Sequence, residues 1–143
     1  MKNGTERFIK EKTLWLFKKI YFFQQPKRRA TARVSRTNYL KYKNQAYHLA
    51  IDRINYFNDI YGFKFNKISI KNQKTRWGSC SKKGNLNFNY RITLLPPSLS
   101  DYIIVHEICH LEEFNHSKKF WNLVEKTIPD YKKLRSELKQ RKT

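Results

Sequence analysis

The sequence predicts a small α+β domain in which helices pack on a short twisted β-sheet or hairpin. Three observations support this fold class: a helical apolar pattern over residues 38–58, alternating apolar and polar residues over 85–92, and a second apolar helix that carries a His-Glu-x-x-His motif. The length of 143 residues allows one modest core. We therefore expect one folded domain over residues 38–143, preceded by a basic, aromatic segment and linker over residues 1–37.

The first expected helix spans residues 38–58. Ala46, Ala50, Ile54 and Phe57 recur at helical spacing and therefore share one face. Gly62 follows this pattern as a typical stop signal. The helix is expected to bury its apolar face against the sheet that comes next in the chain.

A β-region follows this helix. Ile68 and Ile70 alternate with polar residues, and a turn over residues 81–84 precedes the strictly alternating stretch 85–92. This pattern predicts a hairpin with one buried face. The strand over 85–92 could pair with an extended substrate along a sheet edge, or it could simply cover the motif helix.

The motif His106-Glu107-Ile108-Cys109-His110 lies in the next expected helix. Pro96 and Pro97 precede a Ser98-x-x-Asp101 sequence, which is typical of a capped helix start. Residues four apart lie on one helix face, so His106 and His110 can direct two imidazole nitrogens at one metal ion. Glu107 lies about 100° round the helix, where its carboxylate can deprotonate a metal-activated water. A solvent-exposed helix face is the simpler alternative.

A catalytic zinc site needs a third protein ligand. His116 is the nearest candidate, because Asn115 can adopt the left-handed conformation that ends helices and Ser117 can cap the next one. Glu125, on the expected following helix, is the alternative ligand. Zinc is favoured by the motif, although a histidine site can accept other first-row ions.

The formal net charge of +20 is concentrated outside the motif. Residues 1–43 contain 13 Lys and Arg against 2 acidic residues, and residues 126–143 contain 7 against 2. Basic termini could contact nucleic acid or another polyanion, or they could serve solubility alone. The pair Cys80 and Cys109, with no secretion signal, favours a reducing, cytoplasmic setting.

Residues 8–23 combine aromatic and basic side chains. Lys18 and Lys19 interrupt the apolar run, which is far shorter than the ~20 residues a membrane span needs. We therefore expect no transmembrane segment. The stretch could lie on a membrane surface, but packing on the chain's own domain is the favoured interpretation.

Four ordered motifs resemble the YgjP-like metallopeptidase family over roughly residues 38–140. They are the Arg76-Trp-Gly-Ser-Cys80 box, the Asn-containing stretch 85–91, the His106–His110 motif, and Asn115-His-Ser-x-x-Phe-Trp121. The resemblance implies a small zincin fold in which His106, His110 and His116 hold zinc and Glu107 is the general base. Family members are also linked to hydrolysis of nucleoside triphosphates, particularly UTP.

Three functions follow as hypotheses. A zinc-dependent peptidase is favoured and predicts an open groove beside residues 85–92. A metal-dependent nucleotide pyrophosphatase predicts convergence of cationic side chains on phosphates; the candidates are Lys71, Lys74, Arg76, Lys82 and Lys83. A basic nucleic-acid-binding protein with a vestigial site is the third. Arg76 and Asn89 are candidates for contacting substrate or the transition state, and the oligomeric state stays open.

Overall fold

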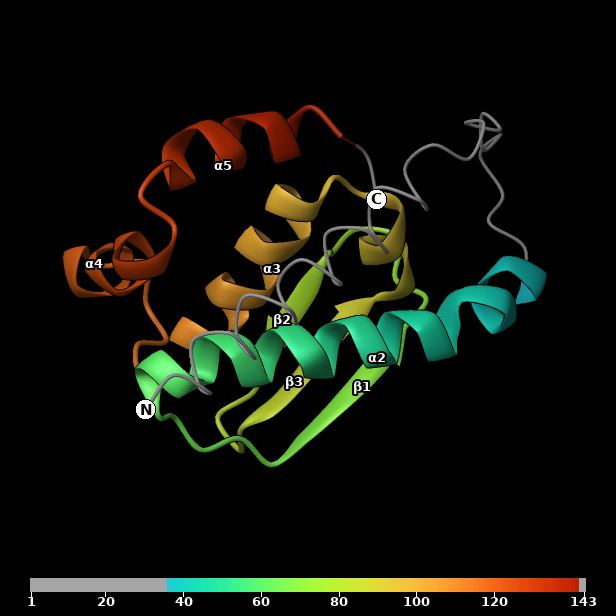
Figure 1. Cartoon of the computed structure of the whole chain (residues 1–143), viewed down its shortest axis with the longest axis horizontal. Helices are drawn as coiled ribbons and strands as arrows, with labels where there is room; N and C mark the ends of the chain where they lie inside the picture. Colours follow the sequence, from blue (N-terminus) through green and yellow to red (C-terminus); the bar gives the residue numbers. More distant parts are fainter. Residues whose placement is uncertain (1–35, 142–143) are drawn as a thin grey trace, which may run out of the picture.

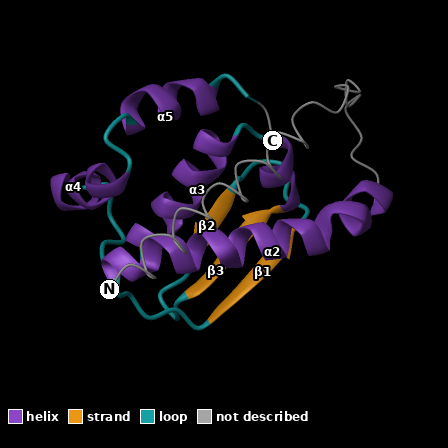
Figure 2. Ribbon diagram, viewed as in Figure 1, coloured by secondary structure: helices purple, strands orange, loops and turns teal. Residues whose placement is uncertain are grey.

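The structure is a computed structural model, and it describes residues 36–141. Its elements, in chain order, are α2 (Arg36–Tyr61), β1 (Lys67–Lys71), β2 (Gly78–Cys80), β3 (Asn85–Asn89), a 3-10 helix η1 (Tyr90–Leu94), α3 (Pro97–Cys109), α4 (Lys118–Thr127) and α5 (Tyr131–Lys139). Figures 1 and 2 show their arrangement. The fold is α+β, as predicted. The expectations for residues 8–23 lie outside the described residues.

The three strands form one mixed sheet in the order β1-β3-β2. β3 pairs in parallel with β1 and antiparallel with β2, so β2 and β3 form the expected hairpin. Its turn contains Gly84, whose φ of 79° is the left-handed conformation that glycine adopts without strain. β3 is the central strand, and the prediction of an open edge along residues 85–92 is therefore wrong. Within residues 36–141, the edge on the α3 side belongs to β2.

α2 packs against β1 and η1, and α3 packs against α2 and β2 (Figure 1). The predicted helical face of α2 is buried through Ala46, Ala50, Ile54 and Phe57. The helix ends as expected at Gly62, whose φ is 69° and whose N–H donates to the carbonyl of Asn58 at 2.7 Å. Among the described residues, no helix is both long and apolar enough to cross a lipid bilayer.

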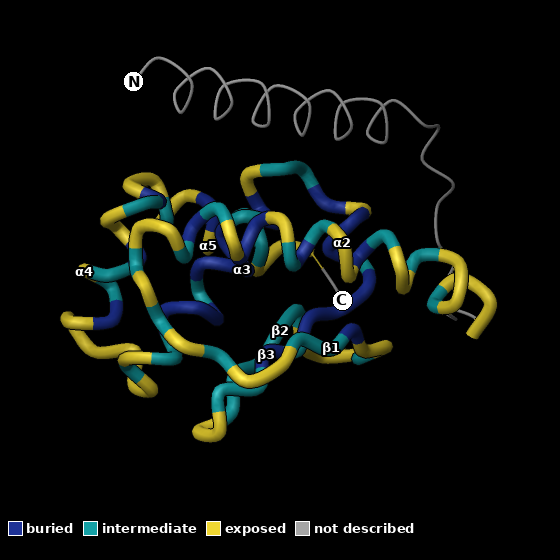
Figure 3. The backbone as a smooth tube through the Cα atoms, turned by 60° about the horizontal axis from the view of Figure 1, so that its bottom comes forward, coloured by how far each residue is buried: buried dark blue, intermediate teal, exposed yellow. Residues whose placement is uncertain are grey.

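The centre of the domain is α3, which is buried along most of its length (Figure 3). Its buried apolar residues contact others from α2, β3, η1 and α4 in one core. Continuous burial explains why this helix shows an apolar run rather than an amphipathic stripe. The motif histidines lie at its C-terminal end, where the chain emerges toward α4.

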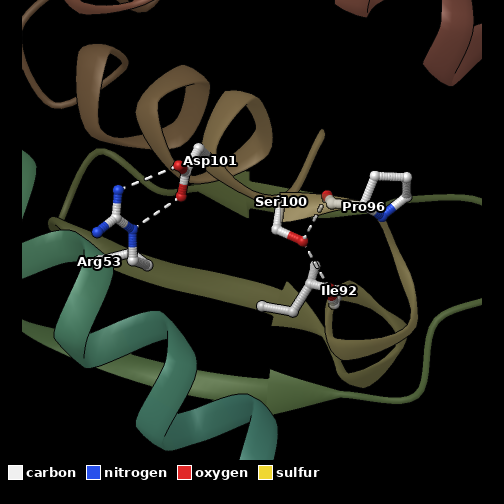
Figure 4. A network of polar contacts seen from close by, with 5 residues as sticks. All are labelled: Arg53, Ile92, Pro96, Ser100 and Asp101. Carbon is white, nitrogen blue, oxygen red and sulfur yellow. Dashed lines mark hydrogen bonds and ion pairs between the residues drawn. The ribbon is translucent and has the colours of Figure 1, made fainter. Parts of the chain in front are cut away.

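Two polar contacts fix α3 in place (Figure 4). Arg53 of α2 donates from Nε and Nη2 to the two carboxylate oxygens of Asp101, at 2.8 and 3.1 Å. The Ser100 hydroxyl, which is buried, donates to the Ile92 carbonyl at 2.7 Å. Asp101 therefore joins two helices, and the predicted Ser98-x-x-Asp101 cap is wrong: Pro96 occupies the N-cap position and Pro97 begins the helix.

The alternation over residues 85–92 is only partly a strand. Leu86, Phe88, Tyr90 and Ile92 are buried as predicted. The strand ends at Asn89, however, because its side-chain carbonyl accepts the Arg91 N–H at 3.1 Å and caps η1. The alternation of apolar and polar residues continues past Asn89 into η1, so it does not reveal where the strand ends.

Candidate metal centre

Three imidazoles converge at the C-terminal end of α3. His106 lies in the last turn of the helix, His110 is its C-cap, and His116 lies just before α4. The Nε2 atoms of the three residues form a triangle with sides of 3.1 Å. Among the described residues, these histidines are the only group of three or more His, Cys, Asp or Glu side chains that lie close enough together to hold a metal ion. The chain therefore returns to the motif at His116, as the spacing predicted.

The chemistry of the three nitrogens fits a cation. The Nδ1 atom of His110 lies 2.9 Å from the Glu113 carbonyl, which can only accept a hydrogen bond. In the neutral ring, Nδ1 therefore carries the proton and Nε2 presents its lone pair. Three Nε2 atoms cannot all donate to one another, but they can share an ion. Nitrogens about 2.0–2.1 Å from a tetrahedral zinc lie about 3.3–3.4 Å apart, a few tenths of an ångström from the observed separation.

Burial favours the neutral form of two of the rings, His106 and His110. Burial lowers the pKa of His106 to about 3, and His110, His116 and Arg135 act in the same direction. Burial also lowers the pKa of His110, against the opposing effect of its hydrogen bond to Glu113. Only a neutral imidazole has a lone pair for a metal, so both shifts favour the ligand form.

Two aromatic side chains of α4 hold the histidines together. Phe120, fully buried, stacks on His110 with a centroid separation of 4.5 Å and meets His106 and His116 edge-on, at 4.9 Å each. Trp121 stacks on the exposed ring of His116 at 5.8 Å. These contacts give the Phe-Trp pair of the fourth motif a physical role. They orient the imidazole of His116, which lies outside α3.

The loop that carries His116 turns without the predicted left-handed residue. No non-glycine residue among those described has a positive φ, so Asn115 does not act as a left-handed helix terminator. Ser117 does occupy the N-cap position of α4, but its side chain makes no capping hydrogen bond. Hydrogen bonds from the Glu112 and Glu113 amides to the Cys109 carbonyl begin the turn instead.

Glu107 lies beside the triad on the sheet side of α3. It is only 7% exposed, and it lines a cavity of about 190 Å³ together with His106 and Arg76. Burial raises the pKa of Glu107 to about 8, and the positive charge of Arg76 opposes this shift. A carboxylate with such a pKa is suited to accept and return a proton near neutral pH.

Strand β2 sets the position of this carboxylate. A Cβ atom added to Gly78 would lie 2.9 Å from Cγ and 3.0 Å from Oε1 of Glu107, and 3.1 Å from the carbonyl oxygen of Asn87. Only glycine leaves room for the Glu107 side chain against the strand. The sequence contained the signal, a glycine between Trp77 and Ser79 where β2 begins, but its role depends on a contact with α3 that local spacing does not reveal.

The two residues predicted to contact substrate or the transition state lie in different environments. Arg76 is exposed and lines the cavity with Glu107, where a substrate could meet it. Asn89 is fully buried, and its Nδ2 donates to the carbonyls of Gln73 and Arg76 at 2.7 and 3.0 Å. Asn89 therefore shapes the loop that bears Arg76 and is not available for direct contact. Glu125 is exposed and is not part of the histidine cluster.

The cationic residues predicted for a nucleotide site do not gather. Arg76 lines the cavity of about 190 Å³ and Lys74 lines an adjoining cavity of about 550 Å³, but Lys71, Lys82 and Lys83 line neither of them. Arg135 and Lys139 of α5 also line the larger cavity, and no local spacing in the sequence connects these side chains with the motif. The nucleotide hypothesis therefore stays a prediction, because only two of its five candidate cationic residues line these cavities.

A short sheet beside a buried helix with the His-Glu-x-x-His motif, completed by a third histidine, defines a zincin-like metal-dependent hydrolase. The YgjP-like metallopeptidase domain model matches residues 51–141, more than half of the chain. The chain belongs to this family. Its expected resemblance and its zincin-like fold class are thus confirmed.

Two solved structures are similar to this chain. The crystal structure of the metallopeptidase zymogen abylysin from Pyrococcus abyssi is 26% identical, with a TM-score of 0.57, and the match covers 62% of this chain and 90% of that one. The zymogen jannalysin from Methanocaldococcus jannaschii is 24% identical, with a TM-score of 0.56 and coverage of 64% and 94%. A search of curated proteins found no match.

Proposed function

We propose that this protein is a zinc-dependent peptidase in which His106, His110 and His116 hold the ion and Glu107 is the general base. The observation that carries the proposal is the 3.1 Å triangle of Nε2 atoms, with Glu107 on the adjoining cavity. Membership of a metallopeptidase family supports the choice of peptide as substrate. A structural metal site would have no need of a buried carboxylate beside it.

Glu107 and Arg76 have different roles in the proposed hydrolysis. When bound, zinc supplies a Lewis acid that lowers the pKa of a coordinated water toward about 7. The Glu107 carboxylate accepts the proton of the attacking water and can return it to the departing amine. Arg76, exposed at the same cavity, can donate hydrogen bonds to the negative charge that develops on the carbonyl oxygen. Burial of Glu107 keeps its carboxylate away from bulk water.

The sheet offers a place for the peptide backbone. Among the described strands, β2 lies at the sheet edge, and its Gly78 contacts the Glu107 side chain. An extended peptide that paired with this edge would bring a carbonyl past the general base. The peptide would therefore pair with β2, and not with residues 85–92 as the sequence predicted.

The experiment begins with metal content. Purified wild-type protein is analysed by mass spectrometry for bound metals, in parallel with His116→Ala and Glu107→Gln. We expect about one zinc per chain in the wild type and in Glu107→Gln, and weaker zinc binding in His116→Ala because one of three ligands is lost. Unchanged zinc affinity in His116→Ala would refute the ligand assignment.

Activity is then measured on an unstructured fluorescent peptide pool and on nucleoside triphosphates, UTP among them. The wild type is expected to cleave peptides, and Glu107→Gln to lose about 10²–10⁴-fold in kcat while keeping its zinc. Cleavage of nucleotides alone, lost in Glu107→Gln, would replace the peptidase proposal with a pyrophosphatase. Equal peptide cleavage by both proteins would show that Glu107 is not the base.

A further inference from the structure

A second, larger cavity opens next to the metal centre. It has a volume of about 550 Å³ and shares Trp77, Tyr102 and Leu138 with the smaller cavity that contains His106 and Glu107. Three shared lining residues make the two cavities neighbours along one surface. A molecule held at Glu107 could therefore extend into the larger cavity.

The larger cavity is strongly basic. Its described lining includes four cationic residues and no acidic one; the cations are Lys74, Arg135, Lys139 and Arg141. Arg76 adds a further positive charge at the smaller cavity. Arg141 pairs with the Glu137 carboxylate at 3.5 Å, and this exposed ion pair contributes little. The lining thus has excess positive charge beside the site of the expected chemistry.

Helix electrostatics explains only part of this cluster. Lys139 and Arg141 lie at the C-terminal end of α5, where cations complement the helix dipole without any ligand. Arg135 lies in the middle of α5, and Lys74 lies on the loop between β1 and β2, so the dipole gives no reason for either. Arg135 is also close enough to add to the lowering of the His106 pKa, which burial causes in the main, and to oppose the rise that burial causes in the pKa of Tyr102.

The cavity has an aromatic wall, and a further aromatic ring outside the wall holds one of its cationic side chains in position. Tyr102 is 4% exposed and Trp77 is partly buried, so both present fixed apolar surface. The Arg135 guanidinium lies 4.9 Å from the ring centroid of Trp121, which itself stacks on His116. α5 lies beside α3 in the fold (Figure 1). Arg135 is thereby held between the metal centre and the basic cavity.

We propose that the larger cavity is a specificity subsite for an acidic side chain of a peptide substrate, near the bond that is cleaved. This inference rests on the proposed peptidase function and adds the substrate class. Carboxylates complement the guanidinium and ammonium groups of the lining, whereas a lysine side chain would meet repulsion there. A volume of about 550 Å³ holds a few side chains of an extended peptide and suits a local preference.

The test uses zinc-loaded wild-type protein and fluorogenic peptides that differ at one position. Glu, Gln and Lys are placed in turn at three positions on each side of the bond, and kcat/KM is measured at low ionic strength. We expect Glu to exceed its isostere Gln by about fivefold or more at one position at least, with Lys poorest. Equal values for Glu and Gln at every position would overturn the subsite.

Charge reversal identifies the residue responsible. In Arg135→Glu, the ratio of kcat/KM for the Glu peptide to that for the Gln peptide should fall to about one. The Lys peptide should become a better substrate, because the local charge is inverted. Lys133→Glu is the matched control: it makes the same charge change on α5, two residues away and outside the lining of both cavities. If Lys133→Glu lowers the ratio as much as Arg135→Glu, the preference comes from overall charge and the proposal is wrong.

Binding separates this inference from the peptidase proposal. Fluorescence anisotropy is measured for an acidic peptide and its Gln analogue on zinc-loaded Glu107→Gln, with and without Arg135→Glu. Selective binding of the acidic peptide that depends on Arg135, without cleavage by the wild type, would support the subsite and refute the peptidase. An RNA oligonucleotide that binds more tightly than the peptide, with a greater dependence on Arg135, would overturn the peptide as occupant.

Discussion

Replacing Gly78 with alanine should separate the position of the general base from metal binding. The new Cβ would lie 2.9 Å from Glu107 Cγ, whereas ordinary contacts are about 3.4–4 Å, so the side chain must move by about 0.5–1 Å. A misplacement of about 1 Å can cost about 10²-fold in rate, or about 2.7 kcal/mol. We expect kcat on the peptide pool to fall about 10–100-fold while zinc content stays at one ion per chain.

Gly62→Ala is the control for this experiment. Gly62 has a φ of 69° and nothing within 4 Å of its added Cβ, so alanine there causes backbone strain at a residue outside the histidine cluster and both cavities. It should cost about 1 kcal/mol of folding free energy and leave kcat unchanged. A folded Gly78→Ala protein with wild-type kcat would refute the inference that β2 positions Glu107.

Three further predictions follow from the contacts of the fold. Asp101→Ala should lower the free energy of unfolding by about 3–5 kcal/mol, measured by urea denaturation, because it leaves the Arg53 guanidinium buried without this carboxylate; a cost below 1 kcal/mol would contradict this. Asn89→Ala should lower it by about 1–3 kcal/mol and also reduce kcat, since the loop bearing Arg76 loses two hydrogen bonds; unchanged stability would refute the role given to Asn89. Chelation of zinc should lower Tm in the wild type and much less in His116→Ala, by calorimetry at fixed protein concentration.

The motif helix and the cluster of three histidines could be predicted from the sequence because they depend on local spacing. His106 and His110 are four residues apart in a helix, and six more residues suffice for a turn that brings back His116. Apolar periodicity likewise indicated α2, because Ala46 and Ile54 are buried where that pattern placed them.

Other features depend on contacts between distant residues and were missed for that reason. The order β1-β3-β2 places residues 85–89 in the centre of the sheet, and no pattern within that strand distinguishes a central strand from an edge. Asp101 has the position of a helix-capping residue in the sequence, yet it pairs with Arg53, 48 residues earlier. In both cases tertiary packing outweighed a local signal.

The metal centre shows most directly why spacing is not sufficient. Its geometry requires β2 to leave room for Glu107, and α4 to place Phe120 against His106 and His110. Each of these contacts joins elements that fold around the same buried helix. The core that stabilises α3 therefore also holds the side chains of the candidate metal site in place. Phe120→Leu should lower metal affinity because the three imidazole rings lose the contact that orients them, although no histidine is removed.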